Sequence, residues 1–214
     1  MAAKSIFEIP TLTGLYRSGA LLACASPVAN PSTSINDRVS LIRGDITKLR
    51  LDAIVNAANR SLLGGGGVDG AIHSAAGPGL YQECLPLGGC ETGQSKITTG
   101  HSLPARYVIH TVGPVYSASN PAKSEALLRS CYDESLKLAV ANGLRTLGFS
   151  AVSTGVYGYP SPDAAEVACR TVRKFLETED GKKLDRVVFV TFEMKDVEAY
   201  NDMLPKFFPP QSPV

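Results

Sequence analysis

The sequence has little of what marks several large classes of protein. Its formal net charge is only +1 over 214 residues. No basic excess therefore predicts general nucleic-acid binding or a polybasic membrane anchor. The apolar run at residues 15–29 is too short to span a bilayer, and Arg17, Gly19 and Pro27 interrupt it. Any charged ligand must be held by a local site.

Patterns typical of disulfides, metal sites and secretion are missing as well. The five cysteines are scattered without a C-x-x-C pair, and the histidines are not clustered. This spacing argues against zinc and favours a reducing, intracellular setting, cytoplasmic or nuclear. The early acidic Glu8 and a late, weak apolar region fit a secretory signal poorly. A mitochondrial location stays open.

What the sequence does contain is a run of four glycines, Gly64 to Gly67, inside residues 43–77. Glycines let a ligand approach the backbone and can direct successive N–H groups into one concavity. Asp69 and His73 follow four residues apart, so a helix over 68–76 would place both on one face near its positive end. The loop and the helix start together predict a phosphate site.

Three other interpretations of the glycines are weaker. The segment lacks the Gly-Lys-Ser/Thr ending of a P-loop. Gly65, Gly67 and Gly70 match G-x-G-x-x-G, but the preceding predicted strand ends too early for a dinucleotide fold. A flexible linker is disfavoured because apolar residues such as Leu62 and Ile72 flank the loop.

Strand and helix patterns alternate along the chain, which predicts a three-layer α/β/α domain. We expect strands at 38–43, 53–56, 106–112, 146–152 and 186–192, and helices at 68–76, 79–85, 123–142, 161–179 and 195–207. Polar, glycine-bearing loops follow several of the strands, so we expect a cleft at one edge of the sheet. Residues 1–37 are expected to form an extension with one short helix and a linker at 30–37; the domain spans 38–208 and 209–214 is a tail.

Five ordered blocks carry a family resemblance: GDIT at 44–47, IVNAAN at 54–59, GGGGVDGAIH at 64–73, YVIHTVGP at 107–114 and STGVYGYP at 153–160. Together they resemble the macrodomain family, and the Asp within the glycine block resembles its MacroD-type branch. The resemblance implies a macrodomain fold, α/β, with a mostly parallel, mixed central sheet flanked by helices. Some macrodomains carry a zinc-binding insertion after the paired asparagines, which this chain lacks. We expect no metal and no cofactor.

The resemblance also implies roles for individual residues. Asp45 would accept a hydrogen bond from the adenine amino group with the Ile46 backbone beside it, and Phe192 is the nearest candidate to stack on adenine. The distal ribose and the phosphates would be held by Asn56, Asn59, Gly66, Gly67, Val68, Ser153, Thr154, Gly155, Val156 and Tyr157. The implied catalytic residues are Asp69, which is closest to hydrolysis, with Asn59 and His73.

Simpler roles remain open for several of these residues. Asp69 is also a residue type that caps helices, and His73 also fits a packed structural role. Asn56 and Asn59 are residue types that stabilise turns through side-chain to backbone bonds. His110, in the middle of an expected strand, is predicted to be structural.

The implied activity is an ADP-ribose-binding hydrolase that removes mono-ADP-ribose from acidic side chains of proteins. The expected partners are mono-ADP-ribosylated proteins and ADP-ribose, with O-acetyl-ADP-ribose as a further substrate for deacetylation. No membrane partner is expected, and the chain is expected to act as a monomer. Two alternatives are a non-catalytic ADP-ribose reader and, less favoured, a dinucleotide enzyme.

Overall fold

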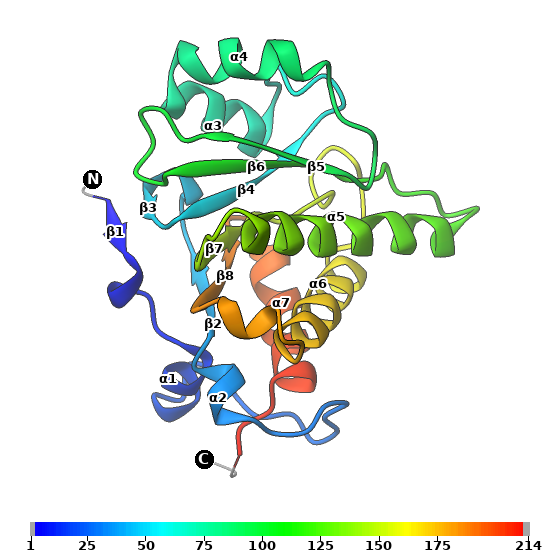
Figure 1. Cartoon of the computed structure of the whole chain (residues 1–214). Helices are drawn as coiled ribbons and strands as arrows, with labels where there is room; N and C mark the ends of the chain where they lie inside the picture. The colour runs from blue at the N-terminus through cyan, green and yellow to red at the C-terminus, as the bar shows by residue number, and fades with distance from the viewer. Residues whose placement is uncertain (1–2, 212–214) are drawn as a thin grey trace.

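The computed structural model describes residues 3–211 and is built on a six-stranded sheet (Figure 1). The strand order is β2-β8-β7-β4-β6-β5. Only the β5–β6 pair is antiparallel, and the other four pairs are parallel. The strands are β2 (Val39–Arg43), β4 (Ala53–Ala58), β5 (Ser95–Thr99), β6 (Tyr107–Val112), β7 (Thr146–Phe149) and β8 (Arg186–Thr191). The predicted mostly parallel, mixed sheet is confirmed.

Helices cover both faces of the sheet, which confirms the three-layer prediction. On one face lie α3 (Gly67–Ala76) and α4 (Pro78–Cys84), and on the other α5 (Pro121–Ala141), α6 (Ser161–Leu176) and α7 (Met194–Phe207) (Figure 1). Neighbouring residues of β4 belong to two apolar cores on opposite faces of the sheet. Ile54 is in the core with Ile72 of α3, and Val55 is in the core with Leu128 of α5. This alternation explains why the strand sequences are apolar almost throughout.

The ends of α5 follow the capping rules. Asn120 caps α5 by accepting a hydrogen bond from the Lys123 backbone N–H at 3.2 Å, and Pro121 opens the helix. The helix stops before Asn142 and Gly143, and Gly143 has a φ of 68°. The expected stop at this pair is confirmed, while the start lies two residues earlier than expected because proline fits the first helical turn.

An edge strand and a short helix are present where the sequence predicted neither. Strand β5 (Ser95–Thr99) was not expected, because its sequence SKITT is mostly polar, as an edge strand allows. The expected linker at 30–37 is wrong in part, because it contains the short helix α2 (Thr33–Asn36), capped by Ser32. Ile35 of that helix is buried in the main apolar core.

The rest of the N-terminal segment also packs against the sheet domain. It contains β1 (Lys4–Ser5), the 3₁₀ helix η1 (Ile6–Glu8) and α1 (Leu12–Arg17), and β1 pairs with β3 (Leu49–Arg50). Leu12 and Tyr16 of α1 join the core. The other 3₁₀ helices are η2 (Ile46–Lys48), η3 (Leu85–Leu87) and η4 (Gly181–Lys183). The boundary between residues 37 and 38 stays a prediction.

Within residues 3–211, none of the helices combines the length and the hydropathy that crossing a bilayer requires.

Candidate ligand-binding and active site

A pocket of about 490 Å³ lies at the carboxyl edge of the sheet, where the sequence predicted a cleft. It is bounded by the segments that follow β2, β7 and β8 and by the start of α3. Its lining residues are Gly44, Asp45, Ile46, Gly67, Val68, Ala71, Ser150, Ala151, Thr154, Gly155, Val190, Phe192, Glu193 and Asp196. A pocket of this volume is large enough for a small-molecule ligand.

The predicted site residues divide into two groups. Seven line the pocket: Asp45, Ile46, Gly67, Val68, Thr154, Gly155 and Phe192. The others lie outside its lining: Asn56, Asn59, Gly66, Asp69, His73, Ser153, Val156 and Tyr157. The sequence prediction missed seven lining residues, of which Gly44 and Glu193 are immediate neighbours of predicted ones.

Asp45 follows β2 and has a structural task besides any ligand contact. Its Oδ1 accepts hydrogen bonds from the Thr47 backbone N–H at 2.9 Å and from Thr47 Oγ1 at 2.6 Å. These bonds cap η2 and fix the direction of the carboxylate. Phe192 follows the neighbouring strand β8 and is 72% exposed.

The glycine loop needs its glycines for both conformation and space. Gly64 and Gly67 have φ values of 85° and 60°, which residues with a side chain rarely adopt. A Cβ on Gly70 would lie 2.4 Å from the carbonyl oxygen of Gly65, so the loop and α3 touch backbone to backbone. Gly66 precedes the helix without any side-chain cap. The first-turn N–H groups of α3 are therefore available to an anion.

Asp69 lies in the first turn of α3 and is only 4% exposed. It does not cap the helix: its Oδ1 accepts a hydrogen bond from Asn56 Nδ2 at 2.8 Å and lies 3.6 Å from His73 Nε2. Burial raises the pKa of the Asp69 carboxyl, and the Asn56 bond and the nearby His73 partly offset that rise. A buried carboxylate beside a predicted phosphate site carries an electrostatic cost, which argues for a functional role in addition to a structural one.

The glycine loop passes close to Asp69, where only a residue without a side chain fits at position 65. A side chain at Gly65 would come within 3.2 Å of Asp69 Oδ2 and 3.1 Å of Asn59 Nδ2. His73 Nε2 is buried and finds no hydrogen-bond partner among residues 3–211. Buried nitrogens are usually paired, so this one has capacity for a ligand or water.

Asn59 is bonded within its own loop. Its Nδ2 donates to the Gly64 carbonyl at 2.8 Å, and its Oδ1 accepts from the backbone N–H and the hydroxyl of Ser61 at 2.9 and 2.6 Å. These bonds match the turn-stabilising role left open by the sequence. They fix the glycine loop over Asp69, and a ligand contact by Asn59 stays a prediction.

The loop after β7 is held in a strained form. Ser153 has a φ of 68° although it is not a glycine, and its buried Oγ has no partner among residues 3–211. A Cβ on Gly113 would lie 2.1 Å from that Oγ, so the two loops approach closely here. Backbone strain of this kind concentrates at functional sites. Val156, at the tip of the loop, is 97% exposed.

Asp196, which the sequence prediction missed, ties the last helix to this loop. It is buried in the first turn of α7 and accepts hydrogen bonds from Thr154 Oγ1 at 3.3 Å and Ser161 Oγ at 2.7 Å. Lys195 Nζ donates to the Thr154 carbonyl at 2.6 Å. An Asp in a helical first turn is common, so no sequence signal separates this one from an ordinary helix residue.

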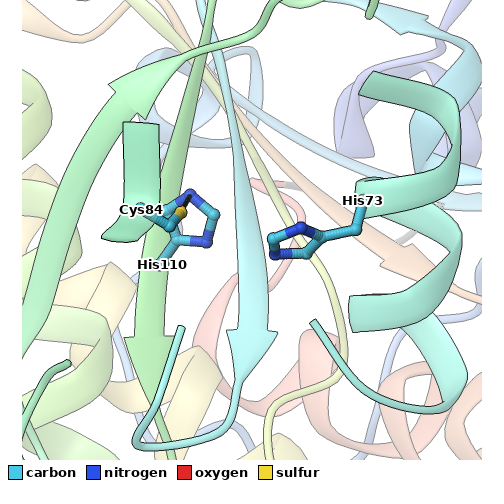
Figure 2. Close-up of side chains that lie close together, drawn as sticks. All are labelled: His73, Cys84 and His110. Carbon is cyan, nitrogen blue, oxygen red and sulfur yellow. Dashed lines mark hydrogen bonds between the residues drawn. The ribbon is translucent and has the colours of Figure 1, made fainter. Parts of the chain in front are cut away.

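Three side chains that can ligate metals come together beneath α3, as Figure 2 shows for His73, Cys84 and His110. Their donor atoms lie within 4.8 Å of one another. Both ring nitrogens of His110 are already within hydrogen-bond distance of side chains, Asn56 Nδ2 at 3.1 Å and Thr98 Oγ1 at 3.0 Å. Burial also raises the pKa of the Cys84 thiol to about 11, which disfavours the thiolate that a metal needs. We assign no ion here, and the expected lack of a metal stays a prediction.

Comparisons with known proteins agree on one family. The family pattern described as Macro domain matches residues 55–168. The ADP-ribose glycohydrolase MACROD2 of Xenopus laevis is 50% identical over 206 residues, which cover 96% of this chain and 49% of that relative. The ADP-ribose glycohydrolase MACROD1 of Bos taurus is 51% identical, with 94% and 62% covered. The chain thus spans about half to three-fifths of the length of these curated relatives.

A solved structure agrees with them. The Trypanosoma brucei macrodomain in complex with ADP-ribose superposes with a TM-score of 0.80 at 44% identity, covering 94% of this chain and 77% of that one. Fold and site define a three-layer α/β protein with a ligand-sized cleft at the carboxyl edge of its sheet. The chain belongs to the macrodomain family.

Proposed function

We propose that this chain binds ADP-ribose in the cleft and removes mono-ADP-ribose from glutamate and aspartate side chains of proteins. The observation that carries the proposal is Asp69, a buried carboxylate held beside the glycine loop and the start of α3. The names of the relatives, ADP-ribose glycohydrolase MACROD1 and MACROD2, support the same activity.

The proposed binding mode follows the chemistry of the cleft. Adenine lies between Asp45, as hydrogen-bond acceptor, and the exposed ring of Phe192. The diphosphate lies on the first-turn N–H groups of α3 and on the loop at 153–157, which contribute partial positive charge without a lysine. The distal ribose then reaches the glycine loop above Asp69, close to Asn59 and Gly66.

The proposed reaction is the hydrolysis of the bond between the distal ribose and the acidic side chain. A water adds to the anomeric carbon, the carbon–oxygen bond to the protein breaks, and the side chain leaves as a carboxylate. Asp69 orients the water and accepts its proton, and His73 Nε2, without a partner among residues 3–211, lies 3.6 Å from the Asp69 carboxylate to hold it or the water. Because burial raises the Asp69 pKa, the rate falls as pH drops through that raised value.

The test is release of ADP-ribose from a carrier protein modified on glutamate. Wild type, Asp69→Asn and Asp69→Ala are compared after titration of each with free ADP-ribose. We expect release by wild type alone, with binding by all three. Binding without release by wild type would overturn the hydrolase and favour a reader, or an acetyl ester such as O-acetyl-ADP-ribose as the substrate. Release by Asp69→Asn at the wild-type rate would overturn the role of Asp69.

We also propose that the protein works in a reducing, intracellular compartment. All five cysteines are unpaired, and four of them are buried among apolar residues. Buried thiols of this kind behave as small apolar side chains and do not depend on an oxidising environment.

A further inference from the structure

A chain of hydrogen bonds crosses three neighbouring strands beneath the cleft and ends on Asp69. Thr98 Oγ1 of β5 lies 3.0 Å from His110 Nε2 of β6. His110 Nδ1 lies 3.1 Å from Asn56 Nδ2 of β4. Asn56 Nδ2 in turn lies 2.8 Å from Asp69 Oδ1. Asn56 and His110 are direct partners in the parallel register of β4 and β6. All four side chains are buried.

The count of donors decides the direction of every bond in this chain. Asn56 Nδ2 carries two hydrogens, and an ionised carboxylate can only accept. One hydrogen therefore goes to Asp69 and the other to His110 Nδ1, which must be unprotonated. The proton of the imidazole then sits on Nε2 and is donated to Thr98. Burial lowers the His110 pKa to about 4, in agreement with a neutral ring at pH 7.

The carboxamide of Asn56 is held from its nitrogen side alone. Its Oδ1 is buried and finds no donor among residues 3–211. Without an acceptor at His110, one amide hydrogen would lose its partner, and only the bond to Asp69 would hold the carboxamide in place. Rotation by half a turn would place Oδ1 against Asp69 Oδ1, and two oxygens that only accept repel each other.

We infer that His110 is a positioning residue: through Asn56 it fixes the direction and the ionised state of the Asp69 carboxylate. This inference rests on the proposed function in one respect: Asp69 is taken as the group that activates water. Asn56 then acts through Asp69, in place of the ribose contact that the family resemblance implies. The hydrogen-bonded residues Thr98, His110 and Asn56 thus lie in an otherwise apolar layer under α3 because they orient Asp69.

Other ionisable groups face this chain and set the background for its titration. His73 lies on the same helix as Asp69, with Nε2 3.6 Å from Oδ1. From α4, the Cys84 thiol lies 3.8 Å from His110 Nε2, and Glu83 acts on His110 through its charge. Since Cys84 stays a neutral thiol below about pH 11, it adds no charge near Asp69 at neutral pH.

The first test measures the Asp69 carboxyl directly, by NMR titration of the ligand-free protein. In His110→Asn the new Oδ1 can accept from Asn56 where Nδ1 did, whereas His110→Leu has similar bulk and no acceptor. We expect the Asp69 pKa to rise by about one unit in His110→Leu, since Asn56, no longer fixed by His110, donates a weaker hydrogen bond to the carboxylate and so favours its ionised form less. His110→Asn keeps the wild-type value. The control His101→Asn, at an exposed histidine bonded to Glu83, leaves it unchanged.

The second test measures release of ADP-ribose by the same variants. We expect kcat to fall about tenfold in His110→Leu, its acidic limb to move to higher pH, and the affinity for ADP-ribose to change by less than about threefold. His110→Asn restores most of the rate. A merely structural role would lower the amount of folded enzyme without moving either pKa or pH limb. Should His110→Leu not fold, Thr98→Val removes the anchor of Nε2, and a smaller upward shift of the Asp69 pKa is expected.

An unchanged Asp69 pKa in a folded His110→Leu, or in Thr98→Val if that variant replaces it, overturns the inference. A wild-type protein that releases nothing overturns the proposed function instead, and the NMR titration still decides the role of His110. The two failures are therefore distinguishable.

Discussion

The two ends of the cleft differ in how their key side chains are exposed and held in place. At one end, Asp45 and Phe192 are exposed, and Asp45 is fixed by bonds within its own short turn. Beyond the other end, just outside the pocket lining, Asp69 is buried and connected through Asn56 and His110 to Thr98 of the edge strand β5. The first arrangement suits binding by contact with a flat ring, and the second suits control of a proton.

The difference has an energetic consequence. An exposed side chain can be removed with little effect on the fold, so its contribution shows in binding alone. A buried charged group with fixed partners affects stability, pKa and reaction together, because low polarity strengthens every interaction around it. Substitutions at the two ends are therefore expected to separate binding from chemistry.

The largest effect is expected at the buried end. Asp69→Ala removes the group proposed to activate water, and a general base contributes on the order of 10²–10⁴-fold to rate. We expect a loss of that size in ADP-ribose release, with binding of free ADP-ribose retained. Calorimetric titration beside a release assay checks both. An equal loss of binding and release would mean that the two ends are not separable.

The next effect is expected where the glycine loop touches α3. Gly70→Ala places a Cβ 2.4 Å from the Gly65 carbonyl oxygen, and overpacking of this kind costs about 1–3 kcal/mol. We expect a lower melting temperature and an affinity for ADP-ribose about ten times weaker, because the loop must move.

The matched control is Gly14→Ala in α1, where the nearest atom, Thr11 Oγ1, lies 3.6 Å away. Alanine in a helix is normally more stable than glycine by up to about 1 kcal/mol. The two substitutions are expected to change stability in opposite directions. A stabilising Gly70→Ala would show that the loop yields without strain.

The buried end is also expected to make stability depend on pH. The His110 pKa is about 4 in the folded protein, against 6.5 for an ordinary histidine. Below pH 6.5 the unfolded chain takes up a proton that the folded protein refuses, so stability falls as pH drops from 7 towards 4. At about 1.4 kcal/mol per pKa unit, the expected loss between pH 7 and 5 is about 2 kcal/mol.

Urea unfolding of wild type and His110→Asn at both pH values measures this loss. The raised pKa of Asp69 works in the opposite direction, since the folded protein takes up that proton first, but it acts in both proteins. The wild type is expected to lose more stability than the variant over this range. Equal losses would mean that His110 is not held neutral.

The sequence predicts the local parts of this site well and the distant ones poorly. The glycine loop and the helix after it are specified by residues a few positions apart, so pattern and turn chemistry suffice for them. Asp45 is predicted through the family resemblance. The contact between Asn56 and His110 joins residues 54 positions apart and depends on β4 lying next to β6. No periodicity in the sequence determines which strands are neighbours.

Two further residues show the same limit. Asp196 reaches the loop at Thr154 only because α7 packs beside it at the end of the chain. Ser153 has a positive φ where its loop lies against Gly113, and a serine gives no local sign of it. Conversely, the polar sequence of β5 concealed a strand because an edge position does not demand apolar residues on both faces.

The smallest effect is expected at the exposed end. Phe192→Ala removes a ring that lines the pocket with 72% of its surface exposed, so the free energy of unfolding is expected to stay within about 0.5 kcal/mol of wild type. If the ring stacks on adenine, affinity for ADP-ribose falls by about 0.5–1.5 kcal/mol, roughly two- to tenfold. The control Phe7→Ala removes a ring that is 94% exposed and outside the pocket lining, and no change is expected. Titration with ADP-ribose and with ribose 5-phosphate sharpens the comparison, because only the ligand with an adenine ring can sense Phe192. Equal weakening for both ligands would place the effect of Phe192 on the shape of the loop after β8.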